Sequence, residues 1–145
     1  MIVLSEGHRD EIAAHGERDY PHECCGLLLG NFADDGGKVI SEVYLISNAR
    51  EEQAKRNRFL IRPEELMRGE RYAQAKGLEV VGFYHSHPDH PAQWSSTDLA
   101  EAHWFGCSYV ITSVEKGKAV LTNSFELTGM DENDKKLVGE KIEVA

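Results

Sequence analysis

The residues with the clearest chemical potential are two histidines at the end of an apolar run. The run starts at Val80 and ends in His85 and His87, which stand in His-x-His spacing with Pro88 directly after them. Such a run predicts a buried strand that the proline must stop. Because an extended backbone points alternate side chains to one face, both imidazoles can approach the same metal ion. The pattern therefore supplies two metal ligands.

A third ligand should lie nearby, because a catalytic zinc site uses about three protein ligands and keeps one position open for water. Asp98 is the candidate, since Ser95 to Asp98 has the form of a helix start and places a carboxylate in the first turn. Two plainer interpretations stay open: Ser-x-x-Asp is also an ordinary capping box, and histidines near a strand end can be exposed polar residues. The gathering of ligand types where loops usually carry function favours a metal site.

The complete spacing resembles the JAMM (MPN+) zinc metalloprotease signature. His85-x-His87 is followed after ten residues by Asp98, with Pro88 directly behind the second histidine and Ser95 three residues before the aspartate. The resemblance implies that His85, His87 and Asp98 bind one Zn²⁺ per chain. It also implies a hydrolase of the metallopeptidase class.

The signature also needs an upstream glutamate, which a second segment supplies. Residues 21–30 read Pro-His-Glu-Cys-Cys-Gly-Leu-Leu-Leu-Gly and are similar to the Pro-x-Glu-x-Cys-Gly-x-Leu-x-Gly segment of the short prokaryotic, Mec-like members of the family. The resemblance covers about residues 4–127 and places the catalytic base at Glu23, which would take a proton from the attacking water and pass it to the leaving amine. Ser95 could donate a hydrogen bond to the oxyanion, or it could cap the helix, a role also open to Ser96.

The order of helix and strand patterns predicts a mixed α/β fold with hairpins. The resemblance implies a single JAMM/MPN domain over 1–145, with a curved mixed β-sheet flanked by helices in a cytidine-deaminase-like arrangement. The polar remainder, 128–145, is interpreted as a terminal helix or a loosely ordered tail. Helices are expected at 5–18, 63–76 and 97–104, strands at 25–30, 38–46, 78–84, 107–114 and 118–127, and a short extended piece at 59–61.

Two of these helices are expected to turn apolar residues toward the core. The residues assigned to the two core faces are Ile12, Ala13 and Ala14 on the first helix and Leu66, Met67, Tyr72 and Ala73 on the second. Between the second strand and the second helix, residues 48–58 are dense in charge and have no apolar stripe. We interpret them as a solvated loop and assign them no chemistry.

Length and composition exclude several classes of protein. At 145 residues the chain is most simply one domain, and its 41% hydrophobic and 28% charged residues give an ordinary globular balance. The net charge of −9 argues against a nucleic-acid partner, because phosphate binding needs a basic face and no basic cluster exceeds Lys135-Lys136. No apolar stretch approaches the ~18 residues that span a bilayer, so we expect no membrane association.

The three cysteines, Cys24, Cys25 and Cys107, form no disulfide framework, because their number is odd and two are adjacent. The N-terminus also lacks the basic start and long apolar core of a signal peptide, so we expect a reducing, cytoplasmic location. Thiol chemistry beside Glu23 is a weaker alternative, since adjacent side chains diverge on an extended backbone. The resemblance implies that Cys25 packs behind the site.

Three other classes compete with the metallopeptidase interpretation. His85-x-His87-x-Asp89-His90 also matches the signature of metallo-β-lactamase-fold hydrolases, but that fold needs a longer chain and further downstream ligands, and the only later histidine is His103. A zinc nucleoside deaminase needs His-x-Glu and Pro-Cys-x-x-Cys elements, which the sequence lacks. Relatives of the JAMM enzymes that lost their ligands are non-catalytic scaffolds or interaction modules. The complete ligand set favours the enzyme.

The resemblance also implies a substrate class. Short prokaryotic JAMM proteins are similar to peptidases that process ubiquitin-like sulfur-carrier proteins. The expected partner is therefore a small carrier with a Gly-Gly C-terminus, and the expected reaction is hydrolysis of the peptide or isopeptide bond after that tail. An extended tail could add beside an exposed strand edge and lead its C-terminus to the zinc.

Overall fold

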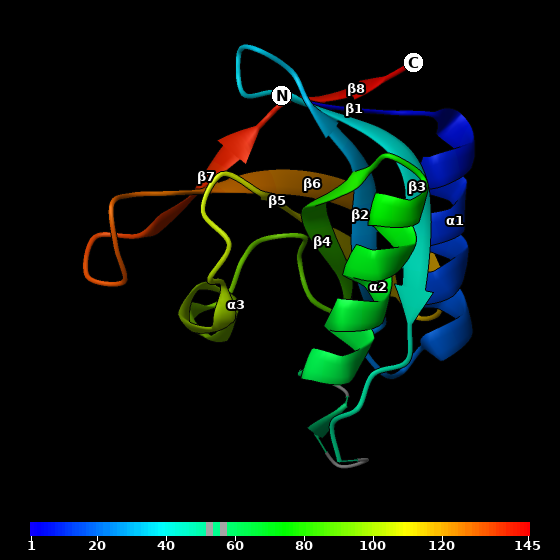
Figure 1. Ribbon diagram of the computed structural model, residues 1–145. Helices are drawn as coiled ribbons and strands as arrows, with labels where there is room; N and C mark the ends of the chain where they lie inside the picture. Colours follow the sequence, from blue (N-terminus) through cyan, green and yellow to red (C-terminus); the bar gives the residue numbers. More distant parts are fainter. Residues whose placement is uncertain (52–53, 56–57) are drawn as a thin grey trace.

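One mixed β-sheet organises the fold (Figure 1). The computed structural model describes residues 1–51, 54–55 and 58–145, and within them eight strands follow the order β7-β6-β5-β4-β2-β3-β1-β8. The strands are β1 (Ile2–Leu4), β2 (Cys25–Phe32), β3 (Lys38–Ile46), β4 (Glu79–Pro88), β5 (Ser108–Glu115), β6 (Lys118–Thr128), β7 (Lys136–Glu140) and β8 (Ile142–Val144). The helices are α1 (Glu6–Asp19), α2 (Pro63–Ala75) and α3 (Ser96–Glu101).

The sheet curls until its two ends come together. β7 and β8 lie at opposite ends of the strand order, yet only Lys141 separates them in the sequence. The backbone N–H of Ile2 donates to the Lys141 carbonyl over 3.0 Å and holds this connection beside β1. The result is the curved mixed sheet flanked by helices that the sequence resemblance implies.

Successive side chains of β2 point to opposite faces of the sheet, and each face is covered by a helix. Leu28 packs with Ile12 of α1 on one face, whereas Leu27 and Leu29 pack with Ala73 of α2 on the other. All three leucines are fully buried. A strand covered on both sides needs apolar residues at every position, and this is why β2 appears in the sequence as an unbroken apolar run.

α1 begins and ends as the sequence predicts, but its buried face is rotated. The Ser5 hydroxyl accepts a hydrogen bond from the backbone N–H of His8 (3.0 Å) and caps the helix. Ile12 is buried, as expected, whereas Ala14 is exposed, and the prediction for Ala14 is wrong. Gly16 is buried instead, because it lies so close to β5 that a Cβ atom there would stand 3.0 Å from Cγ2 of Val114.

α2 approaches the sheet through small residues. A Cβ atom at Gly69 would lie 2.3 Å from Cδ1 of Leu27, and Ala73, one turn later, is buried. Met67 and Tyr72, which the sequence analysis assigned to the core, are instead 50% and 37% exposed. That assignment is wrong for these two residues because α2 approaches β2 through the small residues Gly69 and Ala73, and of the predicted residues Leu66 and Ala73 pack against the core.

One helix boundary also differs from the prediction. α3 ends at Glu101 and does not continue to 104, because Ala102 adopts an extended backbone conformation. Residues 59–61, for which the sequence predicts a short extended piece, belong to none of the described strands, and the Leu60 carbonyl accepts a hydrogen bond from the Ala49 backbone N–H over 3.0 Å. Of the described helices, none has the length and apolarity that crossing a bilayer requires.

The segment 128–145 contradicts the expectation of a terminal helix or a loosely ordered tail. It forms β7, which pairs with β6, and β8, which pairs with β1. The side chain of Glu140 is nearly buried and accepts hydrogen bonds from Lys38 and from the hydroxyls of Ser108 and Ser124. These partners lie far away in the sequence, so the polar composition of the segment hides its place in the sheet.

Candidate metal centre

Three potential metal ligands converge where β4 ends. β4 carries His85 and His87 on one face, and the first turn of α3 supplies Asp98. Nε2 of His85 lies 3.2 Å from Oδ1 of Asp98, Nε2 of His87 lies 3.1 Å from Oδ2, and the two Nε2 atoms are 3.2 Å apart. The structure thus brings together the three residues that the sequence analysis named as ligands.

The spacing and chemistry of these atoms fit a zinc ion. With zinc–ligand bonds of about 2.0–2.2 Å, neighbouring ligands of a tetrahedral site lie about 3.3–3.5 Å apart. Nδ1 of His87 lies 2.9 Å from the Pro91 carbonyl and donates its proton there, which leaves the Nε2 lone pair facing the Asp98 carboxylate. Two facing acceptors need a cation or a proton between them. Two neutral imidazoles and one carboxylate form a donor set that Zn²⁺ accepts.

Surrounding contacts hold each ligand in position. The ring of Phe59 stacks on the buried ring of His85, with centroids 4.7 Å apart and an interplanar angle of 27°. The backbone N–H of Ser95 donates to Oδ2 of Asp98 (2.9 Å), and the backbone N–H of Asp98 donates to Oγ of Ser95 (3.0 Å). Ser95, not Ser96, is therefore the cap of α3. The capping box is compatible with a ligand role for Asp98, since the second carboxylate oxygen stays directed at His85.

Electrostatics favour the ionised carboxylate and a neutral His85. Burial by itself would raise the pKa of Asp98, but hydrogen bonds with His85 and His87 outweigh it and lower this pKa well below its ordinary value. Burial lowers the pKa of His85. Burial also opposes charge on His87, but the hydrogen bonds to Asp98 and Pro91 outweigh it and raise the pKa of that ring.

Strand register brings Glu23 to the same place. Cys25 pairs with His85 across β2 and β4, and the backbone N–H of Ser86 donates to the Cys24 carbonyl over 3.2 Å. Continued by one residue, this register sets Glu23 beside His87, on the face that carries the ligands. Glu23 is only 4% exposed, and it lines a cavity of about 420 Å³ together with His87 and Ser95.

The environment of Glu23 keeps its side chain protonated in the absence of a cation. Burial, reinforced by the negative charges of Asp98 and Glu101, raises the pKa of Glu23 to about 9. Its backbone is fixed as well: the N–H donates to the Lys55 carbonyl (2.6 Å), and the carbonyl accepts from Nδ2 of Asn48 (3.0 Å). A buried carboxyl with a shifted pKa beside a ligand cluster is a candidate for proton transfer.

The loop of 48–58, to which the sequence analysis assigned no chemistry, supports the site. Besides the contact of Asn48 with Glu23, Arg50 donates through its guanidinium to Glu101 (2.9 Å) and to the Phe59 carbonyl (3.2 Å). Residues 52–53 and 56–57 of this loop lie outside the described residues. The sequence gives no signal that distinguishes Asn48 and Arg50 from the other polar and charged residues of this loop, because their partners belong to other parts of the chain.

The cysteines do not contribute a reactive thiolate. Cys24, Cys25 and Cys107 are free and buried. Burial raises the pKa of Cys24 to about 12, and it raises the pKa of Cys25 further. Cys25 packs among apolar residues between the sheet and α2. At neutral pH both thiols beside Glu23 are protonated, so nucleophilic catalysis by either is disfavoured.

His90 of the metallo-β-lactamase signature lines the 420 Å³ cavity but is not part of the ligand cluster, and the other two residues which that interpretation needs, Asp89 and His103, have partners elsewhere. Asp89 accepts hydrogen bonds from the Tyr20 hydroxyl (2.6 Å) and from the backbone N–H of Lys116 (2.8 Å). His103 lies on the surface, 3.3 Å from a carboxylate oxygen of Glu132. Among the described residues, the cluster of metal-ligating side chains contains neither.

Comparisons with known proteins show what the chain is similar to. Residues 5–128 match the model of a family described as prokaryotic homologues of the JAB domain. A desampylase from Haloferax volcanii is 33% identical over 116 residues, covering 77% of this chain and 80% of its own. A Thermus thermophilus protein named "Probable TtuB-protein conjugate cleaving protease" is 28% identical over 121 residues, covering 83% of this chain and 76% of its own.

Solved structures share the whole fold. A solution structure of a Desulfitobacterium hafniense protein has a TM-score of 0.83 and 29% identity, covering 100% of this chain and 93% of that one. A solution structure of a Salinibacter ruber protein has a TM-score of 0.75 and 36% identity, with 100% and 92% covered. The crystal structure of a JAB1/MPN domain protein from Archaeoglobus fulgidus has a TM-score of 0.62 at 18% identity, with 100% and 97% covered, and shows similarity of fold alone.

Proposed function

The chain belongs to the family of prokaryotic homologues of the JAB domain, and from that premise we propose that it is a zinc-dependent metallopeptidase. Its reaction is hydrolysis of the amide bond that follows the Gly-Gly tail of a small ubiquitin-like sulfur-carrier protein. One observation carries the proposal: the His85, His87 and Asp98 ligand atoms converge beside a cavity that His87 lines together with the buried carboxyl of Glu23.

The ligand residues would hold one Zn²⁺ per chain. When bound, the ion would act as a Lewis acid and lower the pKa of a bound water molecule from about 15.7 to about 7, so that hydroxide is available at neutral pH. The chain contributes two rings whose Nε2 atoms are directed at one point and a carboxylate that stays ionised. The hydrogen bond from Nδ1 of His87 to the Pro91 carbonyl selects the tautomer that ligation needs.

Glu23 is the proposed general base and acid. Its carboxylate takes the proton from the water that attacks the scissile carbonyl, and it passes this proton to the leaving amine when the bond breaks. Without a cation, burial together with the negative charges of Asp98 and Glu101 would keep Glu23 protonated at neutral pH. A divalent cation nearby favours the ionised form and moves the pKa of Glu23 down toward the range in which it can accept a proton.

Ser95 is the proposed donor to the oxyanion. Its hydroxyl oxygen accepts the hydrogen bond from the backbone N–H of Asp98, and this leaves the hydroxyl hydrogen available to a substrate. The capping role and the oxyanion role are therefore compatible. Loss of one such donor typically lowers the rate about 100- to 1000-fold.

The substrate class is supported by the two relatives. One is named a desampylase, and the name of the other describes the cleavage of conjugates between TtuB and proteins. We extend this to small ubiquitin-like sulfur carriers as partners, and the leaving group is an amine of an amino acid, a short extension or a conjugated protein. We also propose a cytoplasmic location, since three free thiols suit a reducing compartment, and a net charge of −9 does not suit a nucleic-acid partner.

The test is to mix the zinc-loaded protein with carriers extended beyond Gly-Gly and to follow the carrier mass. We expect loss of the extension up to the second glycine, inhibition by a chelator, and loss of most of the rate with Glu23→Gln, which cannot accept a proton. If isopeptide-linked ubiquitin or unrelated peptides are cut while carriers stay intact, the enzyme class stands and the substrate assignment is wrong. If nothing is cut, a non-catalytic scaffold is the better account.

A further inference from the structure

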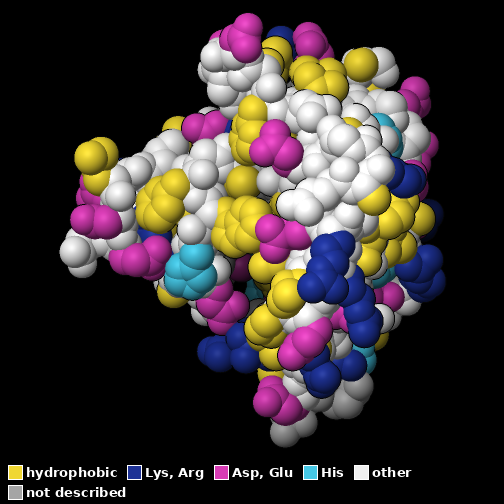
Figure 2. All heavy atoms as spheres, viewed as in Figure 1, with side chains coloured by type: hydrophobic (Ala, Val, Ile, Leu, Met, Phe, Trp, Pro, Cys, Tyr) yellow, Lys and Arg dark blue, Asp and Glu magenta, His cyan; other side chains and the backbone are white. Residues whose placement is uncertain are grey.

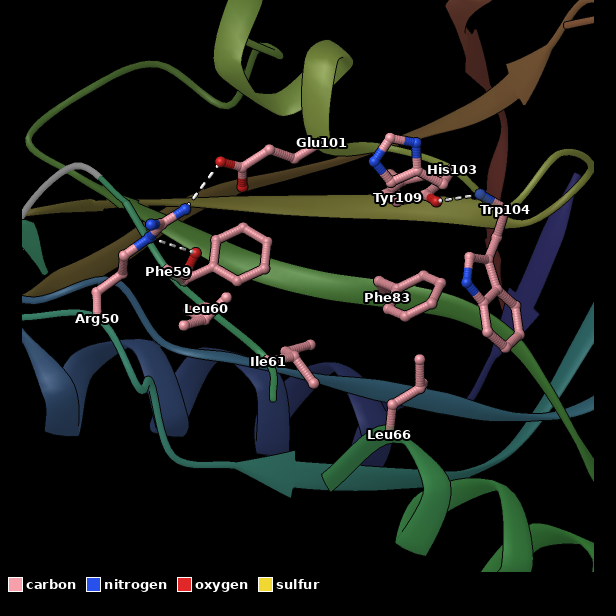
Figure 3. A pocket seen from close by; sticks show the side chains of 10 residues that line it. All are labelled: Arg50, Phe59, Leu60, Ile61, Leu66, Phe83, Glu101, His103, Trp104 and Tyr109. Carbon is pink, nitrogen blue, oxygen red and sulfur yellow. Dashed lines mark hydrogen bonds and ion pairs between the residues drawn. The ribbon is translucent and has the colours of Figure 1, made fainter. Parts of the chain in front are cut away.

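The side chains of β4 alternate between the two faces of the sheet. His85 and His87 lie on the face that α2 covers, as does Phe83, whose ring lines a pocket on that face (Figure 3). The residues between them, Tyr84 and Ser86, point to the opposite face, which α1 covers, and both are fully buried. Their contacts are with the chain on either side of the proposed general base.

Ser86 binds the residue that follows Glu23. Its hydroxyl oxygen accepts a hydrogen bond from the backbone N–H of Cys24 over 2.8 Å, and its own backbone N–H donates to the Cys24 carbonyl over 3.2 Å. Both residues are fully buried, so solvent does not compete for these bonds. Because Ser86 stands between His85 and His87, this double contact ties the neighbour of Glu23 to the neighbour of each histidine ligand.

Tyr84 binds the other flank, which is the end of α1. Its hydroxyl lies 2.8 Å from Nδ1 of His15, and Nε2 of His15 lies 3.3 Å from Oδ2 of Asp19, the last residue of α1 before the short connection to Glu23. The Tyr84 ring also lies directly on β2, because a Cβ atom at Gly26 would stand 2.3 Å from its Cε1 atom. Tyr84 therefore joins α1 and β2 to the strand of the ligands.

A third contact holds the connection between α1 and Glu23. The Tyr20 hydroxyl donates to Oδ2 of Asp89 over 2.6 Å, and Asp89 follows directly after the last residue of β4. The backbone N–H of Asp89 donates to the Val114 carbonyl over 2.8 Å, so this end of β4 is also fixed to β5. The chain is thus held by β4 and its end both before and after Glu23.

We propose that the α1-facing side of β4 positions the general base, with Ser86 as the principal positioning residue and Tyr84 as its support. One strand presents the histidine ligands on one face and holds the segment of Glu23 with the other, so it sets the place of the base relative to the metal centre. A displacement of about 1 Å can lower a rate about 100-fold, because proton transfer requires close contact. The inference rests on the proposed function, since it takes Glu23 as the base.

The first experiment replaces Ser86 by Ala and by Thr. Ser86→Ala removes the acceptor of the Cys24 N–H, so hydrogen exchange of this amide in the metal-free protein should become at least about 10-fold faster. With zinc bound, kcat on an extended carrier should fall about 10- to 100-fold, while KM changes by less than about threefold. Ser86→Thr keeps a hydroxyl and should keep both the slow exchange and the kcat of the wild type.

Thr112→Val is the matched control. Thr112 is buried and pairs with Ser86 in the register of β4 and β5, but its hydroxyl bonds to that of Thr122 on β6 (2.9 Å). This variant also loses a buried hydroxyl, yet it should change neither the exchange of the Cys24 amide nor kcat. Exchange of the Leu28 amide, within β2, separates local release from a general loss of stability.

The second experiment removes hydroxyls from the other flank. Tyr84→Phe keeps the ring against β2 but loses the bond to α1, and Tyr20→Phe loses the bond to the end of β4; each should lower kcat about 3- to 10-fold with zinc retained. Tyr72→Phe is the control. Tyr72 lies on α2, over which Lys and Arg side chains gather (Figure 2), and its hydroxyl accepts a hydrogen bond from Nζ of Lys76 (2.8 Å). It should leave kcat unchanged.

The outcomes separate this inference from the function it rests on. If the wild-type protein cuts no carrier, the proposed function is wrong and the inference with it. If the wild type cuts carriers and folded, zinc-loaded Ser86→Ala keeps its kcat within about threefold, only the inference is overturned. Slow exchange of the Cys24 amide in Ser86→Ala, or loss of zinc from this variant, would overturn it as well. If Ser86→Ala does not fold, Ser86→Cys takes its place, because a thiol of similar size is a weaker acceptor.

Discussion

In the metal-free protein, replacing Glu23 by Gln should increase stability, and the increase should grow with pH. Burial raises the pKa of Glu23 from its ordinary value of 4.5 to about 9 in the folded state. Between these two values the folded chain keeps a proton that the unfolded chain releases, so rising pH destabilises the wild-type fold. Glutamine does not titrate in either the folded or the unfolded state, so the stability of the variant does not fall with pH for this reason.

The expected gain in unfolding free energy follows from the shift in the pKa of Glu23. At pH 7 the unfolded carboxyl lies ~2.5 pH units above its pKa, which corresponds to about 3 kcal/mol at 1.36 kcal/mol per unit. This is an upper figure, since water entering the site reduces it. For a chain of this size it corresponds to a rise of roughly 10 °C in Tm. Near pH 5 the same arithmetic gives less than about 1 kcal/mol.

The assay is thermal and urea unfolding of both proteins after chelation, from pH 5 to pH 8.5. Glu143→Gln serves as the control, because it removes the same charge from an exposed position of β8. Stability of Glu23→Gln that never exceeds that of the wild type, or a gap that shrinks as pH rises, would refute the placement of Glu23 in a desolvated pocket. Zinc should close the gap, since a cation stabilises the ionised wild-type side chain.

Three further predictions follow from other parts of the structure. Asp98→Ala should lose zinc and activity while His90→Ala keeps one zinc per chain by elemental analysis, and the reverse pattern would revive the metallo-β-lactamase interpretation. Cys24 should resist alkylation in the native protein because its thiol is buried and its pKa is raised to about 12; labelling without unfolding, detected by mass, would contradict this. Glu140→Ala should cost about 1.5–3 kcal/mol in urea unfolding, because it removes one of the two carboxylate partners of the fully buried Lys38 ammonium and leaves Glu126 as the other; a loss below about 0.5 kcal/mol would show that this ion pair is unimportant.

The sequence alone predicts the cluster of His85, His87 and Asp98, because its geometry depends on one strand and one helix start. His85 and His87 share a face through strand alternation, and the box of Ser95 and Asp98 fixes a carboxylate at a helix start. Glu23 is different, since only the pairing of β2 with β4 brings it to His87, and its place in the sequence analysis came from the family segment. A sequence pattern that spans a few residues predicts contacts among those residues. It does not predict contacts that depend on the pairing of distant strands.

What the sequence analysis missed depends on distant partners. β7 and β8 are short strands within a segment of polar composition, and they form because β6 and β1 offer free edges and because Glu140 pairs with Lys38. Likewise, Arg50 gains a role only through Glu101, which lies 51 residues later in the chain. Hydrophobic periodicity indicates which side of a helix or strand is apolar, but it does not predict ion pairs between separate elements.

The proposed reaction adds water across the amide bond after Gly-Gly, with Glu23 and the bound metal ion as its catalysts. It is tested by incubating an extended carrier with the zinc-loaded protein in oxygen-18 water and measuring the mass of the released carrier by mass spectrometry. We predict that the new C-terminal carboxylate of the carrier contains oxygen from the solvent, and that Glu23→Gln, folded and zinc-loaded, releases almost no labelled carrier in the same time. A carrier cleaved without solvent oxygen, or a Glu23→Gln protein as fast as the wild type, would contradict the account.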